Sequence, residues 1–361
     1  MLENGRNFFI VVMIILVVVG GSYQVYAYEV ESRVELIQQN TYQPIAEFLR
    51  PEIDRNVQVT SVEVYGNDLY MTTRSPNRLY HFDITELHGL DTFTTYQPPE
   101  KYIEIESIFE GELRTARGLL NVDDVLYVYG NIGLHIFSLE DPNSPVLLDK
   151  LAFSIINLIH FQDYLIAPSS QGAIIFSVVD PASPEYVATL YTPNVRNFSA
   201  AVSNQRLYVS GYVRGEEGST LSIFDLSDLE NIKLIDQIQT DTGLNHHMFS
   251  FHNKLIGCGC DSVVLWSLTE PDSPSLVDQH ETKARTCQIL PNGNLVTNGD
   301  VFSVGDGMLN LRLNMVEVYS PTIDGWPYGA TVAGQFVFLA QSSRVVAIRT
   351  SHFTFLPLIL N

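Results

Sequence analysis

Residues 136–145 read IFSLEDPNSP, residues 175–184 read IFSVVDPASP and residues 265–274 read LWSLTEPDSP. A degenerate copy of the same motif, IFDLSDLE, occupies residues 223–230. A phrase that returns at a fixed period is typical of proteins built from repeated supersecondary units. The repeat therefore decides the fold class before the chemistry of any single residue is considered.

The length of one repeat follows from an apolar residue that comes after a short turn in each unit. These marker residues are Leu69, Leu126, Leu165, Leu207, Leu255, Leu295 and Val337. Successive markers are 57, 39, 42, 48, 40 and 42 residues apart. Because four-stranded propeller blades recur at about 40–45 residues, the spacing predicts an all-β, seven-bladed β-propeller of four-stranded antiparallel blades.

The third repeat shows the expected strands of one blade in order. They are residues 156–161, 164–167, 173–178 and 186–191, with the last as the outer strand. The Asp-Pro-x-Ser-Pro part of the phrase fits a turn before that outer strand, because proline fixes φ and removes a strand donor. Long apolar stripes with helical period are missing from these segments, which disfavours an α/β fold.

The last repeat has no clear fourth strand after residues 345–348. Residues 33–39 (RVELIQQ) resemble outer strands such as residues 233–238 (KLIDQI). We therefore expect residues 33–39 to complete the last blade, which would pair both ends of the chain and remove an exposed sheet edge. The predicted organisation is a linker at 28–32, a propeller at 33–352 and an apolar tail at 353–361.

The first 27 residues resemble a targeting segment. Arg6 precedes twelve uncharged residues, 8–19, and Val25-Tyr26-Ala27 resembles a small-residue cleavage site. The run is short for a membrane span, so residues 1–27 are predicted to be a signal peptide. An uncleaved N-terminal anchor is the alternative, and it would be the only contact with a membrane. The chain is thus expected to be exported to the extracellular space, the periplasm or the cell surface.

The chain is strongly acidic. Its 41 acidic and 20 basic residues give a formal charge of −21, which argues against nucleic acid as a partner because phosphate binding needs a basic surface. Hydrophobic residues make up 45% of the chain, enough for a sizeable core. Acidity of this size is otherwise an ordinary source of solubility.

The chain has three cysteines, Cys258, Cys260 and Cys287, which are too few for a disulfide framework. Cys258 and Cys260 share one face of a predicted strand, so either could reach Cys287 on a neighbouring strand. Buried free thiols are the favoured interpretation. The spacing offers no zinc-like ligand set, and the common hydrolase, metalloprotease and phosphate-loop motifs are missing, so no metal, cofactor or catalytic residue is predicted.

One candidate site comes from the alignment of the repeats. Positions eight to eleven before the markers fall where each inner strand would enter the central channel, and they hold Arg117, Asn157, Arg196, His246, His247, Arg285, Trp326 and Tyr328. The arginines predict a locally positive channel mouth that could bind a carboxylate in bidentate fashion. Trp326 and Tyr328 could stack on a sugar. The plainer alternative is that these are polar strand ends paired with nearby acids.

The repeated phrase resembles the LVIVD repeat, a β-propeller repeat of exported and surface-associated prokaryotic proteins. The resemblance is clear around residues 126–150, 165–191 and 255–280, and partial around 69–97 and 207–240. It implies a propeller and an extracytoplasmic setting, but no activity, cofactor or catalytic residue. The Trp-Asp dipeptide of WD40 repeats is absent from the sequence.

The sequence therefore predicts an extracytoplasmic binding or interaction module that is not an enzyme, with a protein, glycan or small anion bound at one mouth of the channel. Two alternatives stay open. The first is a hydrolase or lyase that uses the same ring of residues, with His246 or His247 as general base. The second is a structural surface or adhesion scaffold.

Overall fold

The structure is a computed structural model that describes residues 11–19, 22–30, 42–50, 57–110, 114–192, 195–213, 218–229, 231–240, 247–259, 262–282, 287–290, 293–297, 300–304, 309–314, 329–341 and 343–350. The chain divides into two units, residues 1–41 with 351–361, and residues 42–350. In the first unit, β1 (Val11–Val19) and β2 (Ser22–Val30) pair as an antiparallel hairpin. Within the described ranges, no helix has the length and apolarity needed to cross a membrane.

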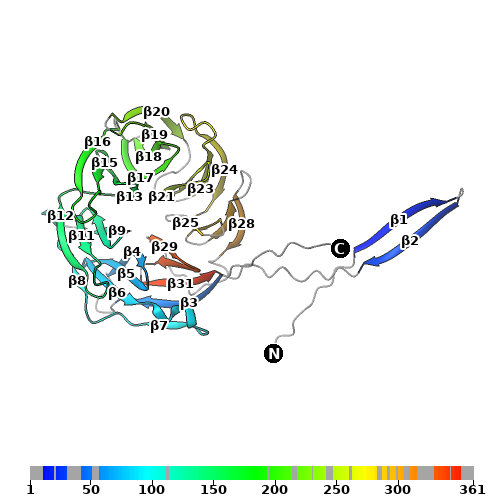
Figure 1. Cartoon of the computed structure of the whole chain (residues 1–361), viewed down its shortest axis with the longest axis horizontal. Coiled ribbons are helices and arrows are strands. Elements are labelled where there is room, and N and C mark those ends of the chain that lie inside the picture. The colour runs from blue at the N-terminus through cyan, green and yellow to red at the C-terminus, as the bar shows by residue number, and fades with distance from the viewer. Residues whose placement is uncertain are drawn as a thin grey trace. The chain divides into compact units, whose positions relative to one another are not determined.

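In the second unit, six sheets have four antiparallel strands each and surround a common centre (Figure 1). The strands of the first three are β4 (Gln58–Tyr65), β5 (Asp68–Arg74), β6 (Arg78–Asp83) and β8 (Ile103–Glu104); β9 (Ala116–Val122), β10 (Val125–Gly130), β11 (Gly133–Ser138) and β12 (Val146–Leu151); and β13 (Ile159–Phe161), β14 (Tyr164–Ser169), β15 (Gly172–Ser177) and β16 (Glu185–Leu190).

The strands of the next three are β17 (Val195–Ser203), β18 (Arg206–Val213), β19 (Ser219–Asp225) and β20 (Lys233–Thr240); β21 (His247–Phe251), β22 (Lys254–Cys258), β23 (Ser262–Ser267) and β24 (Ser275–Glu281); and β25 (Cys287–Ile289), β26 (Asn294–Thr297), β27 (Asp300–Val304) and β28 (Leu309–Asn314). In each sheet the first strand in the chain is the innermost, and each blade is named here by that strand.

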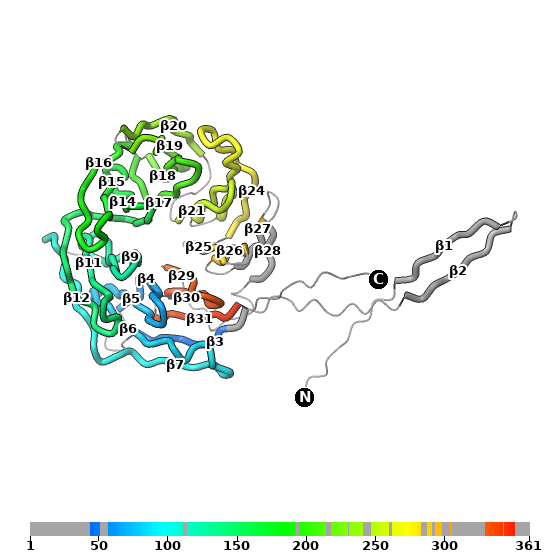
Figure 2. The backbone as a smooth tube through the Cα atoms, viewed as in Figure 1, coloured from blue at the N-terminus to red at the C-terminus, as the bar shows by residue number. Residues whose placement is uncertain are grey.

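A further sheet has five strands and joins the two ends of this unit. It contains β29 (Gly329–Ala333), β30 (Phe336–Ala340), β31 (Arg344–Thr350), β3 (Tyr42–Leu49) and β7 (Thr94–Tyr96). Figure 2 shows β3 beside β31, from opposite ends of the colour scale, and the two pair antiparallel. β7 then pairs with β3 in parallel, and the 3-10 helix η1 (Thr85–Gly89) precedes it in the chain.

The prediction of an all-β propeller with four-stranded antiparallel blades is confirmed, but the predicted number of seven such blades is wrong. Six sheets have that form, because the remaining sheet gains a parallel fifth strand from the long first repeat. An N-terminal strand does complete the last sheet, but it is β3, at Tyr42–Leu49. The predicted strand at 33–39 and the predicted tail at 353–361 lie outside the described residues.

The core lies between neighbouring blades. The two middle strands of a blade are buried on both faces, as in β10, whereas the outer strand β12 is exposed along most of its length. One buried cluster joins Tyr127 and Ile136 of the β9 blade to Leu165 and Phe176 of the β13 blade. Sheets that pack face to face with interdigitated apolar side chains account for the near-continuous apolar character of these strands.

The turns that precede the marker residues have a common backbone form. Asp123, Gln162, Asn204 and His252 all have φ between 50° and 53°. Two-residue hairpin turns need positive φ because their twist must match that of the flanking strands, and asparagine and aspartate tolerate this conformation better than most residues. The short polar turns therefore fix the register of the inner hairpin in each blade.

A repeated hydrogen bond ties each proline corner to the preceding blade. The hydroxyl of Tyr70 donates to the carbonyl of Pro142 at 2.7 Å, that of Tyr127 to Pro181 at 2.6 Å, and that of Tyr208 to Pro271 at 3.0 Å. All three tyrosines are fully buried. The same position is Ile166 or Ile256 in the blades that precede a repeat without the proline corner. The proline of the repeated motif thus supplies the carbonyl that accepts a hydrogen bond from the preceding blade.

Replacing Tyr127 with phenylalanine tests this bond. We expect Tyr127→Phe to lower the free energy of unfolding by about 1–2 kcal/mol, because the partly buried Pro181 carbonyl loses its donor. Urea denaturation measures the difference. Tyr164→Phe is the matched control, because no interaction of the Tyr164 hydroxyl is seen among the described residues, and equal losses in the two variants would contradict this role.

Cys258 and Cys287 form a disulfide that joins β22 to β25 in the next blade, 29 residues along the chain. The expectation of buried free thiols is therefore wrong for these two residues, while Cys260 lies outside the described residues. The sequence offered no means of choosing between the two strand cysteines, since the choice depends on how neighbouring blades pack.

Removal of this disulfide is expected to destabilise the propeller. For a separation of 29 residues, loss of the cross-link in Cys258→Ser/Cys287→Ser should reduce the free energy of unfolding by about 3–4 kcal/mol, mainly by releasing the unfolded chain. Thermal melts with and without a reducing agent measure this. The wild type should melt lower when reduced and the double variant should not respond. An unresponsive wild type would show that the disulfide is not formed.

Candidate functional site

Four of the eight predicted site residues are described by the structure. Arg117 and Arg196 each occupy the second position of an inner strand, β9 and β17. His247 begins β21, and Asn157 lies two residues before β13. The other four, His246, Arg285, Trp326 and Tyr328, lie outside the described residues.

Arg117 is placed by a β-bulge. Tyr129 pairs with Gly118 and Gly130 pairs with Ala116, so Arg117 is the unpaired residue of β9. A bulge bends a strand and redirects a side chain, and bulges are common beside binding sites. The Tyr129 ring lies over Gly118 so closely that a Cβ there would be 2.1 Å from it. The small residue after Arg117 therefore allows the tyrosine to pack on the inner strand.

Three arginines interact at the same end of the inner strands. Burial, followed by the positive charges of Arg196 and Arg74, lowers the pKa of Arg117. Arg74 ends β5, and its Nε donates to Gln58 Oε1 at 2.8 Å. The Arg196 guanidinium lies 5.7 Å from the centre of the Phe198 ring. We call Arg74, Arg117 and Arg196 the arginine cluster.

Arg117 and Arg196 are exposed to solvent, although the surrounding protein shields part of the Arg117 side chain from water. In the described part of the chain, no carboxylate is seen to pair with either residue, and no hydrogen bond is seen from either guanidinium. A guanidinium remains charged at neutral pH even with a lowered pKa. A local excess of positive charge in a protein of net charge −21 is a place where an anion relieves repulsion.

Asn157 belongs to a buried polar chain that crosses four blades. Its Oδ1 accepts from the Tyr129 hydroxyl at 3.3 Å and from the Leu158 amide at 2.8 Å, and its Nδ2 donates to Ser199 Oγ at 3.0 Å. Ser199 Oγ in turn accepts from the Met248 amide at 2.9 Å. Because its amide atoms are already hydrogen-bonded, Asn157 holds the inner strands in place beside the cluster.

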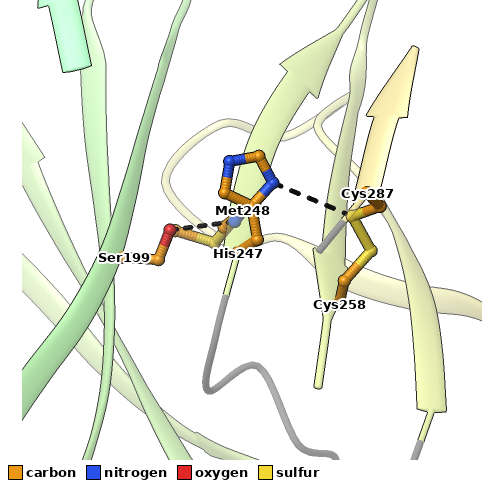
Figure 3. The surroundings of a disulfide bond; sticks show 5 residues. All are labelled: Ser199, His247, Met248, Cys258 and Cys287. Carbon is orange, nitrogen blue, oxygen red and sulfur yellow. Dashed lines mark hydrogen bonds between the residues drawn. A yellow bond between two sulfur atoms is a disulfide. The ribbon is translucent and has the colours of Figure 1, made fainter. Parts of the chain in front are cut away.

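His247 lies beside the disulfide, with its Nδ1 3.9 Å from the Sγ of Cys287 (Figure 3). Burial lowers the pKa of His247, so the ring is neutral at physiological pH and adds no charge to the site. A carboxylate partner that would suit a general base is not seen for this ring among the described residues. No group of three or more potential metal ligands is found there either.

Glu63, a half-buried carboxyl group on the inner strand β4, is not among the site residues predicted from the sequence. Burial raises its pKa from 4.5 to about 7, while hydrogen bonds from the Val64 amide at 3.3 Å and Thr331 at 3.2 Å oppose the shift. Glu63 lies six residues before Leu69, outside the window of eight to eleven that located the arginines. Its environment depends on β29, far along the chain, so no local pattern marks it.

The raised pKa of Glu63 predicts a pH-dependent stability. The folded state holds this proton up to about pH 7, whereas the unfolded chain releases it near 4.5, so stability should fall as pH rises through that window. Glu63→Gln removes the cost of the buried charge and should raise the free energy of unfolding by up to about 3 kcal/mol near pH 8.

Chemical denaturation at about pH 5 and about pH 8 tests the effect. The gain in Glu63→Gln should shrink at the lower pH. Glu140→Gln, at an exposed glutamate, is the control and should show no such difference. A gain that is the same at both values would mean that the Glu63 charge does not cause it.

Comparison with known proteins identifies the fold class alone. No family model matches the chain, and no curated protein matches it. Solved β-propellers do. The WD40 propeller domain of Doa1 superposes with a TM-score of 0.57 at 15% identity, covering 87% of this chain and 98% of that one. BamB from Moraxella catarrhalis gives 0.51 at 17% identity, with 82% and 85% covered. The computationally designed Ika8 protein gives 0.52 at 10% identity, with 86% and 100% covered.

The protein is therefore a β-propeller, a class of fold that commonly serves as a protein-interaction module. At these identities the likeness carries no residue of any binding site across to this chain.

Proposed function

We propose that this protein is an extracytoplasmic propeller of the LVIVD type that binds an anionic group of a protein, glycan or small molecule at one mouth of the central channel. The observation that carries the proposal is the arginine cluster, whose two exposed members lack a described carboxylate partner. A guanidinium binds a carboxylate or phosphate through two parallel hydrogen bonds, which gives orientation as well as affinity.

The proposed mouth has a rigid base. The polar chain through Asn157 and Ser199 fixes the inner strands, and Gly118 lets Tyr129 pack against them. Arg117 and Arg196 are exposed to solvent beside this base, so few side chains other than their own lose conformational freedom on binding.

We also propose that the protein is exported, because an uncharged run at residues 8–19 follows Arg6.

The five-stranded sheet is proposed to act as the seventh blade. Its inner strand β29 contacts both β4 and β25, the inner strands of the first and last four-stranded blades. This arrangement would surround the channel with seven inner strands.

Titration calorimetry with citrate and with inorganic phosphate tests the proposal. Wild-type protein should bind at least one of them, and Arg117→Ala/Arg196→Ala should bind about tenfold more weakly or not at all, because charge-assisted hydrogen bonds are lost. Binding should weaken as ionic strength rises.

The matched control is Lys150→Ala/Lys233→Ala, which removes the same charge from exposed positions on outer strands. It should bind like wild type. If this control lost as much affinity as the arginine variant, the loss of binding would be explained by net charge alone. Unchanged affinity in the arginine variant, or no binding of either anion by wild type, would overturn the proposed site.

A further inference from the structure

The outer strands of the blades share one irregularity. Where each pairs with the third strand of its blade, one residue of the outer strand is extra, which makes a β-bulge. The bulge residues are Leu148 in β12, Val187 in β16, Ile235 in β20, Val277 in β24, Arg312 in β28 and Ile45 in β3. Five of these six residues are aliphatic, so β12, β16, β20, β24 and β3 carry apolar side chains at the same position.

Only one of these side chains is covered. Ile45 is 4% exposed and belongs to the same buried cluster as Ile84 and Leu87, from the segment that leads into β7. The other four aliphatic bulge residues are 38–44% exposed: Leu148, Val187, Ile235 and Val277. The β3 edge therefore shows how an outer edge of this protein is covered, namely by apolar side chains and an added parallel strand.

The residue after the bulge differs between the outer strands. In β12, β20 and β24 it is Asp149, Asp236 or Asp278, and each carboxylate accepts from the next backbone amide, at 2.7, 2.8 and 2.9 Å. An amide held in this way is not offered to an added strand, and charged side chains on edges are a known protection against pairing. In β3, which does accept a strand, this residue is Ala46.

β16 has the sequence of an open edge. Its residue after the bulge is Ala188, as in β3, and no side chain in the described structure accepts from the Thr189 amide. Exposed apolar side chains surround it: Val179 is 77% exposed, Tyr186 54% and Tyr191 71%. Phe153 stacks on Tyr186 with ring centres 5.8 Å apart, but no further strand of the described chain pairs with this edge, unlike that of β3.

We propose that the outer edge of β16 binds an extended segment of a partner protein by strand addition, parallel to β16, as β7 pairs with β3. Backbone hydrogen bonds would supply affinity, and alternate apolar side chains of the segment would cover Val187 and Tyr191. An aromatic side chain is favoured, since Tyr96 of β7 stacks on Phe48 of β3 with ring centres 4.6 Å apart. A basic residue is also favoured, because Glu185 is exposed and the net charge is −21.

The probe is a fluorescent peptide that carries the sequence of residues 92–97 between two lysines, since these residues include the strand that pairs with β3. Fluorescence anisotropy should show binding to wild type. Ala188→Asp should weaken it at least tenfold by capping the Thr189 amide. Because the new aspartate is negative and the peptide positive, purely electrostatic binding would instead become tighter.

Two further arms complete the test. Asp236→Ala should open the β20 edge and raise the stoichiometry, and a peptide methylated at the backbone amides that face β16 should not bind. No binding of the peptide to wild type at millimolar concentration, or equal binding by Ala188→Asp or by the methylated peptide, would overturn strand addition. Sedimentation showing a wild-type dimer that Ala188→Asp dissolves would assign the edge to a second copy and overturn the partner proposed here.

Discussion

The seam between neighbouring blades is the contact on which the rest of the structure depends. A blade of four strands is too thin to bury its own apolar faces, so its core exists only against the next blade. The hydroxyls of Tyr70, Tyr127 and Tyr208 cross this seam and bond to the proline corner of the following repeat. Each also lies in a buried cluster with residues of that neighbour. One side chain thus aligns the corner and fills the core.

Polar side chains also link neighbouring blades, at the inner strands. Asn157 and Ser199 connect neighbouring blades at their inner strands by buried hydrogen bonds. Buried polar groups that are fully paired make a surface rigid, and they leave the bulge at Arg117 as the place where charge points outward. The proposed anion site therefore uses a fixed frame, with only the guanidinium groups left to adjust.

The outer edges of the blades are protected in more than one way. A ring of blades exposes the backbone of every fourth strand, which is a template for pairing. Three aspartates cap their own edge, and the β7 segment covers another. In β16 the position of these aspartates is occupied by Ala188, which has no carboxylate to accept from the next backbone amide. A single residue type at one register position therefore separates a protected edge from an open one.

The sequence by itself determined the all-β propeller class, the inner hairpins and the placement of Arg117 and Arg196 near the start of their inner strands, because each depends on local periodicity or on an offset within one repeat. Only the tertiary structure decided that Tyr42–Leu49 closes the last sheet, that Cys258 rather than Cys260 meets Cys287, and that Glu63 is buried. These features join residues from different blades or from opposite ends of the chain. Their energies depend on how blades pack, and a pattern within one repeat carries no information about that packing.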